Sequence, residues 1–198
     1  MLRLTLLVAL TLACGASGPI AARAQDVSRA AGESDLAFAA RSLQLPKEAH
    51  PHTTDTTWNG HPTLFVDYET PAADPERQIV ALQQQPGGGY RILQVTLGEQ
   101  EGATPGLVAI GLANADRDPA QELIVILAWP QQHYDVEGTL YEVRIFDDPK
   151  PGQTALTQLK SSHKFDATCD CGWRDGTSKR FRFKTIAAVK AELKRLGY

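Results

Sequence analysis

The chain has 198 residues, of which 42% are hydrophobic and 22% charged, with a formal net charge of −3. This length allows one domain with a sizeable core. Beyond the first residues, no segment reaches the roughly 18 apolar residues of a transmembrane helix, so we expect no transmembrane helix in the mature protein. The charge is uneven: residues 26–172 carry ten Lys or Arg against twenty-one Asp or Glu, and residues 173–198 carry eight against two. We expect an acidic body with a basic tail.

The first residues have the pattern of a secretory signal peptide. Arg3 precedes the apolar run 4–12, and Ala22-Arg23-Ala24 forms an A-x-A cleavage pattern. We therefore predict cleavage near Ala24 and a periplasmic or secreted mature protein, which excludes nucleic acid as a partner. A lipid anchor at Cys14 is the less favoured alternative, because the residues before it match a lipobox poorly.

The mature N-terminal part, residues 25–60, is predicted to be one short helix followed by a loop. Ser34 is a good helix N-cap, and Pro46 follows closely after the apolar positions Leu36, Ala40 and Leu43. The next residues mix Pro, Thr, Asn and Gly with three histidines, which favours a loop. A metal-free loop is favoured over a metal site, because no Cys or carboxylate stands at a ligand spacing from the histidines His50, His52 and His61.

In residues 61–198 the apolar positions alternate with the two-residue period that is typical of β-strands. Alternating apolar positions and two runs around Pro86 and three glycines predict strands and a hairpin. The predicted strands lie within 63–70, 77–98, 107–112, 122–129 and 141–145, with a last one carrying Phe181 and Phe183. The run 122–129 is apolar throughout, so we expect a strand that is covered on both faces.

A C-terminal helix is predicted from about Thr185. Ile186, Val189, Leu193 and Leu196 form one apolar stripe, and Gly197 is placed to end the helix. The predicted fold is thus of the α+β class: an antiparallel-rich sheet with a short N-terminal helix and a C-terminal amphipathic helix packed on it, in one globular domain.

The segment NADRDPAQELIVILAW carries oxygen-bearing side chains at alternate positions before the apolar strand. Asn114, Asp116 and Asp118 alternate, and Glu122 follows as the strand begins. Over about residues 114–125 this segment resembles the calcium loop of FG-GAP and VCBS-type repeats from integrin-like propellers. The resemblance implies calcium as the cofactor, the four side chains as ligands, and the Ala120 carbonyl as a backbone ligand.

Two departures from that pattern weaken the implied calcium site. Pro119 stands where the family has glycine, and proline cannot adopt the positive φ of a sharp turn. Asn114 also brings one negative charge fewer than the usual aspartate. These departures favour a metal-free acidic turn over an occupied calcium site. Because a single copy is visible, a propeller is not expected.

The mature chain holds two cysteines, Cys169 and Cys171, in the sequence TCDCGW. In an oxidising compartment we predict a strained local disulfide that clips a loop. The alternative is a small envelope thiol-disulfide enzyme using this pair, although the motif is C-x-C and no thioredoxin-like context surrounds it. A zinc site that adds His163 lacks a clear fourth ligand.

Candidate binding residues are aromatic or basic and lie toward the C-terminal half. Exposed aromatic side chains in loops can form a recognition surface, although such side chains are as often lids over the core. A basic cluster can attract an anionic partner, with a solvated face as the simpler alternative. The candidates are Trp129, Tyr134, Lys179, Arg180, Arg182 and Lys184. We therefore expect an exported non-catalytic binding domain whose partner is a protein or an anionic envelope polymer.

Overall fold

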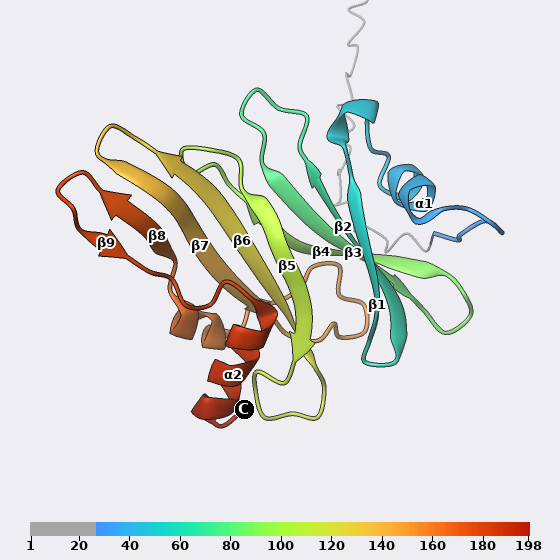
Figure 1. The fold of residues 1–198 in the computed structure, drawn as a ribbon. Helices are drawn as coiled ribbons and strands as arrows, with labels where there is room; N and C mark the ends of the chain where they lie inside the picture. The colour runs from blue at the N-terminus through green and yellow to red at the C-terminus, as the bar shows by residue number, and fades with distance from the viewer. Residues whose placement is uncertain (1–26) are drawn as a thin grey trace, which may run out of the picture.

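The computed structural model describes residues 27–198, which form two antiparallel sheets packed face to face with a helix on each outer side (Figure 1). The predicted signal peptide, with Cys14, lies outside the described residues. Within the described part, no helix combines the length and apolar character needed to cross a membrane. The expectation of a β-rich fold with a helix near each end is confirmed, but a single sheet was expected and two are present.

The first sheet is a meander of four strands in the order β1-β2-β3-β4. The glycine-rich connection predicted between two runs is a hairpin that joins β3 to β4 and contains Gly87 and Gly88 at positive φ. The strands are β1 (His52–Trp58), β2 (His61–Glu69), β3 (Arg77–Gln84) and β4 (Tyr90–Gly98). A loop was predicted where β1 lies. That prediction was wrong because β1 is an edge strand of mostly exposed polar residues, without the alternation that marks a half-buried strand.

The second sheet has five strands in the order β5-β6-β7-β8-β9. Strand β6, which lies between β5 and β7, is buried from Glu122 to Leu127, as the continuous apolar run predicted. The strands are β5 (Gly106–Ala113), β6 (Glu122–Gln132), β7 (Val136–Phe146), β8 (Thr168–Trp173) and β9 (Ser178–Lys179). Phe181 and Phe183 were expected in a strand, but they lie beyond β9 in a connection that packs onto the sheet.

The main core lies between the two sheets. Alternate residues of each strand point inward, so the two inner faces interdigitate as in other sheet-on-sheet packings. Its buried members are Trp58, Phe65, Ile79, Ala81, Leu93 and Val95 from the first sheet, and Leu123, Val125, Leu127, Trp129 and Phe146 from the second.

Helix α1 (Asp35–Ser42) covers the outer face of the first sheet. The Ser34 hydroxyl accepts a hydrogen bond from the Ala37 N–H, as a helix N-cap does. Phe38 and Ala39 are fully buried against the sheet. Leu36, which was placed on the apolar stripe, is 51% exposed, because the short helix turns its Phe38 side toward the sheet.

Helix α2 (Ile186–Leu196) covers the outer face of the second sheet. Thr185 caps its first turn and Gly197 ends it in the left-handed conformation, with φ 90°. Val189 and Leu193 pack against Ile124, Ile126 and the other outward residues of the sheet. The predicted amphipathic helix and its packing on the sheet are confirmed.

The outer edge of β4 is covered by segments from distant parts of the chain. The Gln94 N–H donates to the Thr154 carbonyl, and the Leu156 N–H donates to the Gln94 carbonyl, each at 2.8 Å. At the start of β4, Val27 and Tyr90 exchange two backbone hydrogen bonds of 2.9 and 2.7 Å. The start and the middle of this edge strand therefore have backbone partners.

Candidate functional site

Three carboxylates meet in the loop between β5 and β6, at the end of the molecule near the C-terminus of α2 (Figure 1). They belong to Asp116, Asp118 and Glu122, and one oxygen of each lies within 4.8 Å of the others. The sequence pattern therefore placed these three residues together correctly. Such a group of oxygen ligands could hold a metal ion.

The loop is shaped by its own short polar side chains. The Asp118 N–H donates to Asp116 Oδ1, and the Ala120 N–H donates to Asp118 Oδ1, each at 2.8 Å. The Asn114 amide nitrogen donates to the Asp118 carbonyl. These are the local turns that Asp and Asn side chains favour. In both aspartates Oδ1 accepts the hydrogen bond of the turn, so Oδ2 can interact with other groups.

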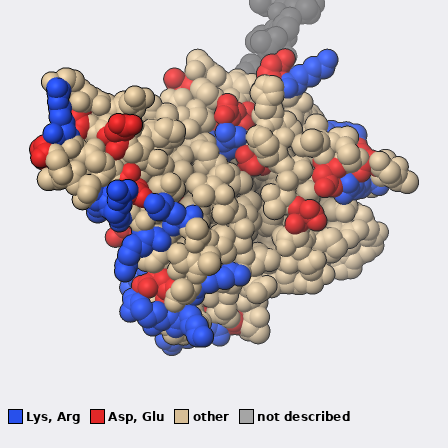
Figure 2. All heavy atoms as spheres, in the orientation of Figure 1, with Lys and Arg blue, Asp and Glu red and all other residues tan. Residues whose placement is uncertain are grey.

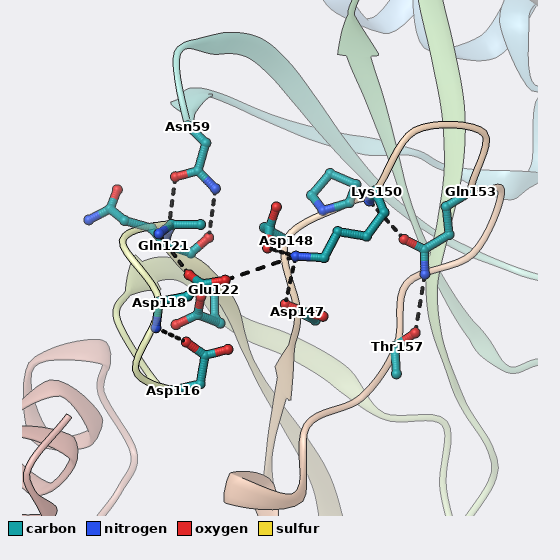
Figure 3. A network of polar contacts seen from close by, with 12 residues as sticks. Asn59, Asp116, Asp118, Gln121, Glu122, Asp147, Asp148, Lys150, Gln153 and Thr157 are labelled. Atoms are coloured by element: carbon teal, nitrogen blue, oxygen red, sulfur yellow. Dashed lines mark hydrogen bonds and ion pairs between the residues drawn. The ribbon is translucent and has the colours of Figure 1, made fainter.

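The β1–β2 hairpin of the other sheet holds the end of this loop. The Trp58 indole N–H donates to the Gln121 carbonyl at 2.6 Å, and the Asn59 amide donates to the same oxygen at 3.0 Å. The Gln121 N–H donates back to Asn59 Oδ1 at 2.9 Å. Figure 3 shows the two bonds between Asn59 and Gln121 beside the acidic residues. The loop is thus fixed to both sheets just before Glu122.

Glu122 is the buried member of the group. Its side chain has no solvent exposure, its Oε2 accepts a hydrogen bond from the Ala115 N–H, and its Oε1 has no hydrogen-bond partner among the described residues. Burial, together with the nearby carboxylates of Asp116 and Asp118, raises the pKa of Glu122 to about 7, against the opposing effect of the Ala115 and Asp116 backbone N–H groups. A buried carboxylate in this position is stabilised by a proton or by a cation.

A second acidic group adjoins the first and shares Asp118 with it. One oxygen of Asp118, Asp147 and Asp148 again lies within 4.8 Å of the others. The Lys150 ammonium forms an ion pair with Asp148 and lies 3.6 Å from Asp147 Oδ1 and 4.0 Å from Asp118 Oδ2 (Figure 3). This second group already contains a cation of the protein. In the described part of the chain, the Lys150 ammonium forms ion pairs with these three aspartates and none with Glu122.

Sequence reasoning missed Asp147, Asp148 and Lys150. They follow the end of β7, and the pairing of Phe146 with Leu123 brings that end beside the start of β6. A pair of aspartates directly after a strand is a visible signal. Assigning these aspartates to the acidic site requires knowing that β7 pairs with β6 in this register, and the sequence pattern does not specify that pairing.

Cys169 and Cys171 lie on β8 with their Cα atoms 5.2 Å apart, within disulfide distance. Cys171 is 2% exposed, and it pairs across the sheet with Gly138 on β7. A Cβ atom on Gly138 would lie 2.6 Å from Cys171 Cα and 2.7 Å from its Sγ. The absence of a side chain at Gly138 therefore makes room for the cysteine pair. Among residues 27–198, no metal-ligating group of the kind found in the acidic loop includes a histidine or these cysteines.

The substitution Gly138→Ala is expected to destabilise the protein by about 1–3 kcal/mol, because the added methyl overlaps backbone and sulfur that cannot move independently. Urea unfolding followed by tryptophan fluorescence measures the change. Gly172→Ala is the matched control, since a Cβ at this neighbouring position on β8 meets nothing within 4 Å. Equal losses for the two variants would contradict the role given to Gly138.

The structure separates the two candidate aromatic residues. Trp129 is 2% exposed and belongs to the core between the sheets, where its indole N–H donates to the Glu99 carbonyl at 2.8 Å. Of the two roles expected for it, a recognition surface or a lid over the core, Trp129 takes the second, because it continues the inward alternation of β6. Tyr134 is 87% exposed beside the Arg174 guanidinium. It lines an open cavity of about 560 Å³ with Trp173.

The candidate basic residues lie at and beyond β9. Lys179, Arg180 and Arg182 are exposed and Lys184 is half-buried. Asp170 accepts ion pairs from both Arg180, at 3.1 Å, and Lys184. Two of the four candidate cations are therefore paired within the protein, both with the single carboxylate of Asp170.

Glu122 and its acidic neighbours are the part of the described structure whose chemistry most clearly calls for a cation. Comparison with protein-family models, with curated proteins and with solved structures finds no match for the chain.

Proposed function

We propose that the chain is a non-catalytic binding domain that holds a divalent cation, calcium by preference, between Asp116, Asp118 and Glu122. The observation that carries this proposal is the fully buried Glu122 carboxylate, which lies beside two further carboxylates and whose Oε1 finds no hydrogen-bond partner within residues 27–198. A divalent ion would satisfy that oxygen and offset the repulsion among the three carboxylates.

The ligand set favours calcium over other common divalent ions. Zinc prefers nitrogen and sulfur ligands, and this group offers carboxylates. Magnesium demands near-ideal octahedral geometry and gives up its water reluctantly, whereas calcium accepts irregular oxygen cages completed by carbonyls and water. The resemblance of residues 114–125 to a calcium loop supports the same ion. Asn114 and the Ala120 carbonyl remain the further ligands that the resemblance implies.

A calcium site of this kind would be suited to a protein that is exported from the cell. Calcium modules outside the cell commonly bind with dissociation constants of about 10⁻⁴ to 10⁻³ M, and a site with three carboxylates and a proline in its loop is expected in that range. The proposed location is the periplasm or the cell exterior, as the pattern in residues 1–24 predicts. The proposed partner is a protein or an anionic polymer of the envelope.

The rival function, thiol-disulfide exchange at Cys169 and Cys171, has less support. A thiol enzyme needs an accessible sulfur, whereas Cys171 is 2% exposed and packs against Gly138, and Cys169 is half-buried. We therefore propose a structural role for the pair. Alkylation of the reduced cysteines should leave a binding domain active and would inactivate a thiol enzyme.

Calcium at ten times its dissociation constant is expected to stabilise the chain by about 1.4 kcal/mol and to raise Tm by roughly 3–6 °C over the value in EDTA. Calorimetric titration and thermal unfolding with calcium or magnesium measure the binding and its selectivity. Glu122→Gln should abolish the shift because it removes a buried anionic ligand. Glu101→Gln is the control, since it removes one exposed carboxylate outside the loop. If the unsubstituted chain shows neither heat of binding nor a shift in Tm, the loop is a metal-free turn.

A further inference from the structure

Positive charge is concentrated in the last part of the chain. Residues 159–198 carry ten Lys or Arg and four Asp or Glu, a balance of 10 − 4 = +6. Residues 27–158 carry eight and eighteen, a balance of 8 − 18 = −10. The two parts of the described chain therefore have opposite charge.

The fold gathers the positive part on one face of the molecule. The 3-10 helix η2 (Lys160–Phe165) and helix α2 both pack over the outer side of the second sheet, through Phe165, Val189 and Leu193. Figure 2 shows Lys and Arg atoms massed over the position that α2 occupies in Figure 1. We call this surface the basic face. Its cations are Lys160, Lys164, Arg180, Arg182, Lys184, Lys190, Lys194 and Arg195.

Most of these cations are left without an acidic partner. Asp170 pairs with Arg180 and Lys184, and Glu192 pairs with Arg195 at 2.5 Å. Among residues 27–198, the remaining cations of the face form no ion pair and are exposed: Lys160, Lys164, Arg182, Lys190 and Lys194. By contrast, five of the eight cations in residues 27–158 are paired, namely Arg29, Arg41, Arg77, Arg144 and Lys150. The basic face is thus the main concentration of uncompensated positive charge in the described structure.

We infer that the basic face docks on the surface of a membrane that contains anionic phospholipid. Clusters of exposed Lys and Arg are attracted to the negative surface potential of such membranes, and lysine binds headgroup phosphates as a mobile point charge. Four of the five unpaired cations come from η2 and α2, and Arg182 comes from the connection just before α2, all on the same side of one sheet, so they can meet a broad planar surface together. Tyr198, 37% exposed just beyond α2, adds the amphipathic aromatic side chain that is favoured at headgroup depth.

The sequence outside the described residues favours this partner. The apolar run 4–12 predicts delivery of the chain to a membrane, where a phospholipid surface is the nearest anionic partner. Docking through charge needs no apolar insertion, in keeping with the burial of Val189 and Leu193 beneath α2. It does not depend on the cation proposed for Asp116, Asp118 and Glu122.

The test is co-sedimentation of the full chain with vesicles of phosphatidylcholine alone or mixed with phosphatidylglycerol, in EDTA at low salt and at about 0.15 M salt. We expect binding to the mixed vesicles that weakens as salt is raised. Lys190→Gln/Lys194→Gln should reduce the binding constant roughly 10- to 30-fold, since each lysine near an anionic surface contributes about a fivefold factor. Lys190→Arg/Lys194→Arg should retain the binding, because it keeps the charge.

Lys47→Glu is the matched control. It changes the net charge by the same two units, but on an exposed residue next to the opposite sheet, and it should leave binding nearly unchanged. The N-terminal apolar run is common to all variants, and the phosphatidylcholine vesicles report its contribution. Equal binding to both vesicle types, equal loss in Lys47→Glu, or binding to soluble polyphosphate without binding to mixed vesicles would each overturn the assignment. Because the test is made in EDTA, its outcome is independent of calcium binding at the loop.

Discussion

Trp58→Ala is expected to lower the free energy of unfolding by about 3–5 kcal/mol, the range found for removing a fully buried large aromatic side chain. Trp58 has no solvent exposure, packs on Phe65 and belongs to the core between the two sheets. The substitution would leave a cavity between the sheets and would also remove the indole N–H that holds the Gln121 carbonyl. Urea unfolding followed by circular dichroism measures the loss.

Trp58→Phe separates the two contributions. It keeps most of the apolar volume and removes the indole hydrogen bond, while the Asn59 amide still donates to Gln121. We expect a loss of about 1–2 kcal/mol from the bond and the smaller ring. If Trp58→Ala cost less than about 1 kcal/mol, Trp58 would not be part of the core that joins the two sheets.

In metal-free buffer, the protein is expected to lose about 3 kcal/mol of stability as the pH rises from about 4.5 to above 7. The cause is Glu122, whose pKa is raised from 4.5 to about 7 by burial in the folded state. Between these values the folded protein holds a proton that the unfolded chain has released. Stability therefore falls as pH rises, and the loss is complete above the folded pKa.

Glu122→Gln tests this origin, because glutamine has the same shape and does not titrate. The difference in unfolding free energy between the variant and the unsubstituted chain, measured in EDTA across the pH range, should change by about 3 kcal/mol. Asp67 and Asp147 also have pKa values raised by burial, but both proteins share them, so their effects cancel in the difference. Parallel stability curves for the two proteins would show that Glu122 does not titrate in this way.

Both helices were predictable because their boundaries depend on local chemistry. Ser34 and Thr185 cap first turns, and Gly197 takes the left-handed conformation that ends α2. The buried strand β6 was equally clear, since a continuous apolar run needs cover on both faces. What the local pattern could not specify was the number of sheets. That number depends on which strands pair and on where the meander breaks between β4 and β5.

The acidic site was predictable to the extent that it lies within one loop. Asp116, Asp118 and Glu122 are close in sequence, so their meeting requires only a turn. Asp147, Asp148 and Lys150 join them through the register of β6 with β7, a long-range contact that residue spacing does not reveal. The inward position of Trp129 follows from the two-residue alternation of Leu123, Val125 and Leu127, and it could have been read from the sequence.

The backbone partners at the start and in the middle of β4 have a consequence for self-association. An unpaired edge strand invites another chain to extend the sheet, and proteins block this with cover or with polar residues. In the first sheet, Val27 and residues 154–156 obstruct one margin, so growth by an added strand is directed to β1. The exposed edge formed by β1 is rich in threonine and carries Asp55, so its polar side chains discourage aggregation through this sheet.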